Sequence, residues 1–180
     1  MNITLNKKKI HNIQSSVEII ILNKIKHLSK NEKEILDNIN FLKKSFNTHF
    51  DVKNSKLYIS CLKLKDENIK TAISSAIKLL KNIKNENIKI DIIQSEKELN
   101  IQTIIEGLVL GNYEFLKYKS SQNNKSIKKI EISIFNSDKQ KDELEADLKK
   151  ALIICNSVNY TKDIVNSSPE DYYPLIMAND

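Results

Sequence analysis

Three histidines and two cysteines are the side chains best suited to metal binding or nucleophilic chemistry in this chain. His11, His27 and His49 lie in the first fifty residues, whereas Cys61 and Cys155 lie far apart. Metal-binding pairs usually recur at intervals such as i and i+4, and no two of these five residues share such an interval. We therefore expect surface or loop histidines and two reduced, buried thiols, as in a cytosolic protein.

A second candidate cation site is a cluster of four acidic residues, Asp142, Glu143, Glu145 and Asp147. The cluster falls at the start of the longest helical pattern, where negative charge complements the helix dipole, so a structural role is favoured. The sequence also lacks a G-x-S-x-G motif, a Walker loop and a dinucleotide fingerprint, which two glycines could not supply. We predict no catalytic, cofactor-binding or metal-binding residue in this chain.

The net charge of +6 is the main reason to consider nucleic acid as a partner. All 29 basic residues are lysines, however, and arginine is the residue that makes bidentate contacts with guanine and phosphate. The excess is concentrated in residues 1–60, which hold 11 lysines against 5 acidic residues. Frequent lysine, asparagine and isoleucine together are what an AT-rich coding sequence would produce. A lysine-rich nucleic-acid-binding module stays an alternative function, with weak binding expected.

Short apolar runs alternate with helical patterns along the chain, which is typical of an α/β fold. Residues 17–22 form a continuous apolar run suited to a central strand that is buried on both faces. Residues 48–52 and 56–62 predict a hairpin that turns at residues 53–55. Further strands are expected at residues 3–5, 87–93 and 130–134, and helices at residues 31–44, 67–84 with Asp66 as N-cap, 100–117 and 139–165.

The length and composition, 180 residues with 40% hydrophobic side chains, are sufficient for one core. No apolar run approaches the roughly 18–20 residues that would span a bilayer, and the first ten residues lack a signal-peptide pattern. A helix over residues 139–165 would be about 40 Å long, which is more than a small domain needs. Pro169 and Pro174 follow it, so we expect this helix to end near Asn166 and to act as a connector.

The only two glycines, Gly107 and Gly111, stand four residues apart in a segment expected to be helical. This spacing places both on one face of the helix. Glycine inside a helix costs about 1 kcal/mol relative to alanine. Two glycines at this spacing therefore indicate a face that another backbone approaches closely.

Two segments of the sequence match a known family. Residues 106–120 (EGLVLGNYEFLKYKS, the first signature) resemble the pattern A-E-G-A-x-L-G-x-Y-x-F-D-x-Y-K-S of leucyl (cytosol) aminopeptidases, starting at its glutamate. Residues 163–178 (DIVNSSPEDYYPLIMA, the second signature) resemble that family's D-L-V-N-T-P-P-N-x-x-T-P-x-x-L-A. Ser168 replaces a proline of this pattern, Glu170 its asparagine, and Lys162 the arginine that usually precedes it. All four glycines and prolines lie in these signatures.

The resemblance implies a macro-domain-like fold for residues 1–138, a three-layer α/β/α arrangement with a mixed sheet of about six strands. It implies that residues 139–180 form an interdomain linker helix and the start of a catalytic domain, which would lie beyond Asp180. Macro domains proper bind ADP-ribose through glycine-rich loops. This sequence has no such loop, so nucleotide binding is not expected.

The family's second domain holds two divalent metals, Zn or Mn, and removes amino-terminal residues from peptides in the cytosol. The family enzymes are homo-hexamers, in which the amino-terminal domain supports assembly and the access to the active sites. The resemblance therefore implies that this chain is a non-catalytic domain of a cytoplasmic metallo-aminopeptidase. Its expected partner is its own carboxy-terminal catalytic domain, and no membrane is expected.

Overall fold

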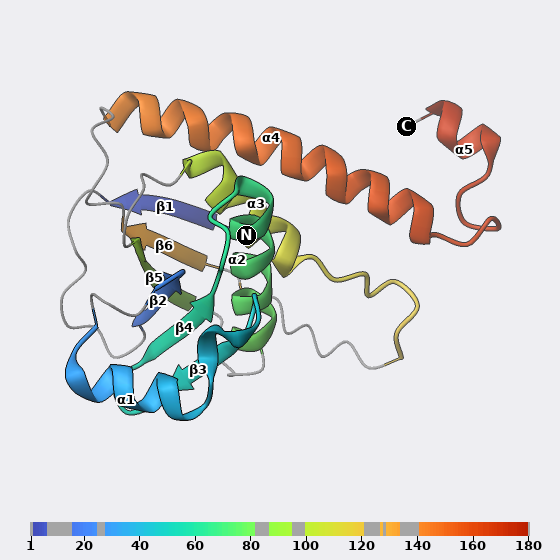
Figure 1. The fold of residues 1–180 in the computed structure, drawn as a ribbon. Helices are drawn as coiled ribbons and strands as arrows, with labels where there is room; N and C mark the ends of the chain where they lie inside the picture. The colour runs from blue at the N-terminus through green and yellow to red at the C-terminus, as the bar shows by residue number, and fades with distance from the viewer. Residues whose placement is uncertain are drawn as a thin grey trace.

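The computed structural model describes residues 2–6, 16–24, 28–81, 87–94, 100–120, 127, 129–133 and 141–179. They form a six-stranded sheet with helices on both faces (Figure 1). Across the sheet, the strands are β1 (Asn2–Asn6), β6 (Lys129–Ser133), β5 (Asn87–Gln94), β2 (Ser16–Leu22), β4 (Lys56–Ser60) and β3 (Thr48–Asp51). Neighbouring strands are parallel, except that β3 pairs antiparallel with β4. The α/β class and the mixed sheet expected from the sequence are confirmed.

Strand β2 lies between β5 and β4 and is buried on both faces, as its continuous apolar run predicts. Its side chains alternate, so that Ile19 and Ile21 enter the larger core while Ile20 and Leu22 enter a smaller one on the other face. The predicted hairpin is also confirmed. Its turn is held by Asp51, whose carboxylate accepts hydrogen bonds from the backbone and side-chain nitrogens of Asn54 at 3.2 and 2.7 Å.

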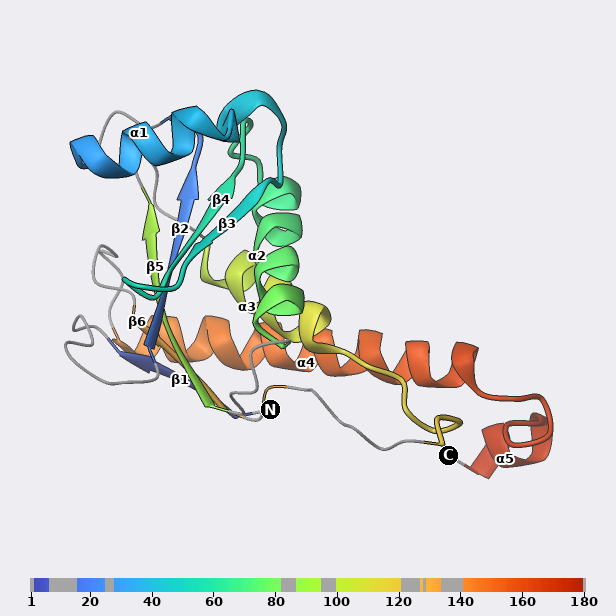
Figure 2. The ribbon, with the colours of Figure 1, turned by 90° about the horizontal axis from the view of Figure 1, so that it is seen from below.

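Helices α2 (Asp66–Leu80) and α3 (Ile101–Asn112) cover the face of the larger core (Figure 2). The helix predicted over residues 67–84 is present as α2, whose apolar side chains are buried from Ile69 to Leu80, and residues 82–84 lie outside the described residues. The expectation that Asp66 is the N-cap is wrong by one position, because Lys65 precedes the first helical residue. Asp66 still lies in the first turn, where its charge complements the helix dipole.

The opposite face is covered by α1 (Lys30–Asn38) and the 3-10 helix η1 (Phe41–Lys43). The prediction of one helix over residues 31–44 is wrong, because Asn40 adopts a left-handed conformation with φ 52° and ψ 43°. The break turns Phe41 into the smaller core, where it joins Leu36 and Tyr58. The helical spacing of apolar residues in the sequence does not indicate where a helix breaks, so it could not predict this turn.

A polar cluster attaches the start of α1 to the sheet. Glu32 completes a capping box with Ser29, and its Oε1 also accepts hydrogen bonds from Lys56 Nζ at 2.7 Å and from Tyr58 OH at 2.6 Å. Burial alone would raise the pKa of Glu32, but the hydrogen bonds from Lys56, Ser29 and Tyr58 together lower it to about 2. The carboxylate thus stays charged while it bridges α1 and β4.

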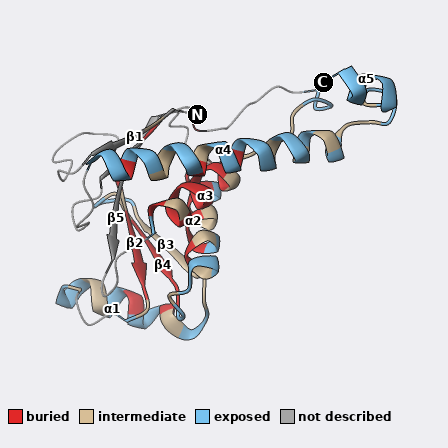
Figure 3. Ribbon diagram, turned by 90° about the horizontal axis from the view of Figure 1, so that it is seen from above, coloured by how far each residue is buried: buried red, intermediate tan, exposed pale blue. Residues whose placement is uncertain are grey.

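Helix α4 (Lys141–Asn166) has two unlike halves. Leu144, Ala151 and Cys155 belong to the larger core, so the first half, residues 141–155, packs on the domain. Residues 156–166, which we call the overhang, contain no buried residue and extend beyond the sheet toward α5 (Pro174–Asn179) (Figures 1 and 3). The expected long helix is present. Its division from the preceding domain at residue 139 stays a prediction, and α5 was not foreseen.

The predicted end of the glycine-bearing helix at residue 117 is wrong, since α3 ends at Asn112. Tyr113 leaves the helix with an extended ψ of 137°. Residues 113–120, which we call the arm, then run outward on the same side as the overhang (Figure 2). In the described part of the chain, no helix is both long enough and apolar enough to cross a membrane.

Candidate functional site

The two signatures meet in the structure, and their contact forms the candidate functional site. The first signature supplies most of α3 and the whole arm, and the second supplies the end of α4, the following loop and α5. The site therefore lies where the chain leaves its core.

The glycine face of α3 is the foundation of this site. A Cβ atom placed on Gly111 would lie 2.8 Å from Ser74 Cα, and one on Gly107 would lie 2.9 Å from Ile73 Cβ. Ser74 also donates a hydrogen bond from Oγ to the Gly107 carbonyl at 3.0 Å. These contacts leave no room for a side chain, which confirms that the glycines serve a close approach of two backbones.

The glutamate of the first signature, Glu106, anchors α3 to α2 beside the glycine face. It forms an ion pair with Lys70 and accepts a hydrogen bond from Gln102 Nε2 at 2.8 Å. Burial would raise the pKa of Glu106, but the hydrogen bonds from Lys70 and Gln102 lower it below its ordinary value. Only 9% of the residue is exposed, so its charge needs these partners.

Two further contacts fix the point at which the arm leaves α3. Lys81 Nζ donates to the carbonyl oxygens of Asn112 at 2.6 Å and Tyr113 at 3.4 Å, which satisfies the end of the helix. The Asn112 side chain exchanges two hydrogen bonds with the Ile127 backbone, each 2.9 Å long. Burial is the largest influence on the Lys81 ammonium group, and it lowers the pKa of Lys81.

At the base of the arm, Tyr113 contacts the overhang. Its hydroxyl donates to Asp163 Oδ1 at 2.8 Å and accepts from Asn166 Nδ2 at 3.4 Å. Lys162 Nζ lies 4.9 Å from the centre of the Tyr113 ring, within the range of a cation–π contact. Burial, followed by the hydrogen bond to Asp163, raises the pKa of Tyr113. Asp163, Asn166 and Lys162 all lie at or beside the start of the second signature.

Nearer the tip of the arm, Tyr118 makes a similar pair of bonds with the loop that follows α4. Its hydroxyl donates to Asp171 Oδ2 at 2.8 Å and accepts from the backbone N–H of Ser168. Lys117 Nζ lies 3.1 Å from the same Asp171 oxygen. The hydrogen bond from Tyr118, followed by that from Lys117, lowers the pKa of Asp171. Each tyrosine hydroxyl thus acts as donor and acceptor between the two signatures.

Beyond these polar contacts, the overhang and α5 expose large apolar side chains. On α4 the exposed fraction is 64% at Ile153, just before the overhang, and 78% at Val165. On and beside α5 the same holds for Tyr173, Leu175, Ile176 and Met177, with 64% exposed at Leu175. Figure 3 shows α5 in the colour of exposed residues and the overhang in the colours of exposed and intermediate residues. This arrangement offers an apolar surface for packing.

The residues first considered for chemistry that the structure describes, His49, Cys61 and Cys155, do not converge with other metal-binding side chains. His49 lies on β3 and stacks beside Tyr58, and His11 and His27 fall outside the described residues. Cys61 and Cys155 are free and buried, as expected, and burial raises the pKa of Cys155 to about 11. Among the described residues, no three or more His, Cys, Asp or Glu side chains are placed to hold a metal ion.

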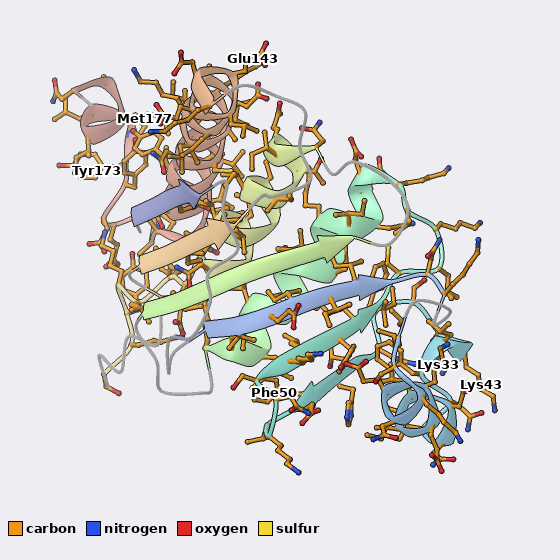
Figure 4. All side chains as sticks on the ribbon, turned by 90° about the vertical axis from the view of Figure 1, so that its left-hand side faces the viewer. Lys33, Lys43, Phe50, Glu143, Tyr173 and Met177 are labelled. Atoms are coloured by element: carbon orange, nitrogen blue, oxygen red, sulfur yellow. The ribbon has the colours of Figure 1, made fainter. Side chains whose placement is uncertain are left out.

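Many lysines of the described segments have partners within the chain. Lys56, Lys70 and Lys117 each form an ion pair, and Lys81 caps α3. Half-buried Lys33 and exposed Lys43 lie around α1 and η1, at the opposite end of the molecule from Tyr173 and Met177 (Figure 4). A basic surface, if one acts, would therefore be separate from the site formed by the two signatures.

Sequence reasoning identified both signatures but missed that they bind each other. Nothing in the spacing of Tyr113 and Tyr118 indicates a partner about fifty residues away. The one available signal was chemical, since each tyrosine has an aspartate counterpart, Asp163 and Asp171, in the second signature. Lys81 gave no sequence signal at all.

Comparisons with known proteins agree with the resemblance seen in the two signatures. The sequence model for the N-terminal domain of the cytosol aminopeptidase family matches residues 54–122. A probable cytosol aminopeptidase of Campylobacter jejuni is 32% identical over 185 residues, covering 100% of this chain and 38% of the relative. One of Wolinella succinogenes is 26% identical over 183 residues, covering 99% of this chain and 38% of the relative. The chain thus spans well under half the length of these relatives.

The fold is also shared with a solved structure. A mutant of tomato leucine aminopeptidase superposes with a TM-score of 0.77 at 15% identity, over 99% of this chain and 41% of that one. This likeness concerns the fold alone, whereas the first signature lies wholly within the residues that the family model matches. The chain belongs to the cytosol aminopeptidase family and carries its N-terminal domain.

Proposed function

We propose that this chain serves as the non-catalytic amino-terminal domain of a two-metal leucyl aminopeptidase. The observation that carries the proposal is the coverage: relatives named cytosol aminopeptidases match the whole chain with only 38% of their own length. The remaining length of such an enzyme is where its catalytic domain would lie. The parent enzyme would act in the cytoplasm and remove amino-terminal residues from peptides.

The two unlike halves of α4 support this division of labour. The first half completes the core of the domain, and the overhang and α5 expose apolar side chains that a second domain would cover. We propose that residues 1–138 form a macro-domain-like unit and that residues 139–180 lead into the catalytic domain. Leu144 and Cys155 pack on that unit, so the linker would be anchored to it.

The catalytic chemistry would belong to the second domain. Two divalent ions, Zn or Mn, would activate a water molecule and polarise the scissile carbonyl there. The described residues of this chain offer no set of ligands that fits such ions. In a homo-hexamer, this domain would contribute to assembly and to the access of peptides to the active sites.

An activity assay tests the proposal directly. The purified chain of residues 1–180 and the longer product of the same gene are compared on leucine p-nitroanilide with added Mn²⁺ or Zn²⁺, and EDTA-treated samples serve as controls. We expect metal-dependent turnover by the longer product and none by residues 1–180. Metal-dependent turnover by residues 1–180 alone, or a stop codon directly after Asp180, would contradict the proposal.

A further inference from the structure

We infer that the arm is a rigid support that holds the chain beyond the core in one direction. Tyr118 is the positioning residue of this support. The inference concerns residues of this chain only and holds whether or not the proposed function is correct. It rests on the two attachments, through Tyr113 and Tyr118, that join the arm to the overhang and to the loop after it.

The segment that the arm would hold, residues 156–179, has few other contacts that fix it. Residues 156–166 extend about 16 Å past Cys155, the last buried residue of α4, at 1.5 Å per residue. Residues 167–179 contain no buried residue either. A segment with few buried contacts opens readily unless specific contacts hold it. Here the described contacts are polar and come largely from the arm.

The arm itself is fixed at its start, where it leaves the end of α3. Lys81 caps the end of α3, and Asn112 is tied to the Ile127 backbone by two hydrogen bonds. Phe115 packs edge-on against Tyr118 with ring centroids 5.6 Å apart, which supports the ring that carries the distal hydroxyl. The arm thus starts from a helix in which all residues but Gln102 and Leu110 are buried.

The two attachments differ in what they fix. Tyr113 holds the overhang at Asp163, near the end of α4, and one attachment alone would leave the following loop free to pivot. Tyr118 holds the loop on both sides of Pro169, because it accepts from the Ser168 N–H and donates to Asp171. Tyr172 in the same loop also contacts Tyr160 on α4, with their hydroxyls 3.2 Å apart. Two separated attachments remove the pivot and give the loop and α5 one direction.

Lys117 is not equivalent to Tyr118 in this role. Its ion pair with Asp171 joins side chains that are 47% and 42% exposed, so water and salt screen it. The Tyr118 hydroxyl has directional bonds to two groups, one of them backbone. Removing the hydroxyl while keeping the ring therefore isolates the positioning effect.

The test uses Tyr118→Phe in the purified 180-residue chain, with Tyr173→Phe as the matched control on an exposed ring whose hydroxyl has no hydrogen bond to another described residue. NMR measures amide exchange at Ser168, Asp171 and Tyr172, and the order parameters of residues 168–179. In Tyr118→Phe we expect the Ser168 amide to exchange about tenfold faster or more, and the order parameters to fall from about 0.85 to below about 0.6. The control should match the wild type, and the melting temperature of both variants should stay within about 2 °C of it.

Three outcomes would overturn the inference. The first is that residues 168–179 are as ordered in Tyr118→Phe as in the wild type. The second is that Tyr173→Phe loosens the loop to the same extent. The third is a large fall in melting temperature in Tyr118→Phe, which would mean that the hydroxyl stabilises the core and not the direction of the loop.

Discussion

Helix α3 and the overhang of α4 each contain part of a family signature, yet they bury very different amounts of surface. All but two of the residues of α3, Gln102 and Leu110, are buried, including polar Thr103 and Asn112. In α4 the buried residues are Leu144, Ala151 and Cys155, and none lies after residue 155. Helix α3 is fixed mainly by packing, and the overhang is fixed by a few polar contacts.

The difference separates residues that stabilise the domain from residues that present a surface. Burial of apolar area supplies most of the stability of a small domain, so substitutions in α3 should act on folding. Substitutions on the overhang should leave the free energy of unfolding almost unchanged. They should instead weaken the packing of any partner against this surface. Regions with few buried contacts are also the first to open locally, which hydrogen exchange detects.

The largest expected difference is in the free energy of unfolding, between the variants Ile105→Ala and Ile153→Ala. Ile105 is fully buried, whereas Ile153 is 64% exposed on α4. We expect Ile105→Ala to lower the free energy of unfolding by about 2–5 kcal/mol, because it leaves a cavity in the core. Ile153→Ala should change it by about 0.5 kcal/mol or less. Urea denaturation measures the free energy of unfolding of both variants. Equal losses of stability in the two variants would contradict the difference between α3 and the exposed face of α4.

A second test adds a side chain instead of removing one. Gly111→Ala should lower the free energy of unfolding by about 1–3 kcal/mol, since the new Cβ would lie 2.8 Å from Ser74 Cα. This loss would appear despite a gain of about 1 kcal/mol in helix propensity. Asn156→Ala on the exposed overhang is the matched control and should be neutral or slightly stabilising. A Gly111→Ala variant as stable as the wild type would refute the close approach of α2 and α3.

The attachment of α1 provides an intermediate case that depends on pH. The folded pKa of Glu32, about 2, lies below its ordinary value of 4.5, so its contribution to stability is complete above about pH 4.5 and is lost as the pH falls toward 2. We expect Glu32→Gln to be about 1 kcal/mol less stable at pH 7. The gap between the variant and the wild type should close between about pH 4.5 and 2.

Urea denaturation at a series of pH values measures this gap. Glu34→Gln, an exposed position on the same helix, is the control. A gap that stays constant down to pH 2 would show that Glu32 does not act through its charge.

The smallest effect concerns the basic end of the molecule. We expect nucleic acid to bind weakly and without sequence preference, because the chain has no arginine and many of its described lysines are paired. Affinity that comes from phosphate contacts should fall about tenfold or more between 50 and 200 mM salt. Lys33→Glu with Lys43→Glu should weaken it further, whereas changes on the overhang should not. A sequence-specific complex that survives physiological salt would favour the alternative function.

The sequence predicted what local patterns determine. The apolar run of β2, the hairpin of β3 and β4, the stripe of α2 and the close contact at Gly107 and Gly111 all follow from residue type and spacing. These features need only the chemistry of neighbouring residues.

The errors arise where distant residues decide the outcome. The helix expected over residues 31–44 breaks at Asn40 because Phe41 turns into a core made with Tyr58. Helix α3 ends at Asn112 because Lys81 and Ile127 bind its last residues. The contacts of Tyr113 and Tyr118 join positions about fifty residues apart. No local pattern carries this information.

Hydrogen exchange along α4 tests most directly the claim that one half of this helix belongs to the core and the other is presented to a second domain. The measurement compares the 180-residue chain with the longer enzyme that the proposed function requires. We predict that amides near Ala151 and Cys155 exchange slowly in both proteins, and that residues 156–166 and 174–179 exchange slowly only in the longer one. Equal exchange of residues 156–166 and 174–179 in the two proteins would contradict the account.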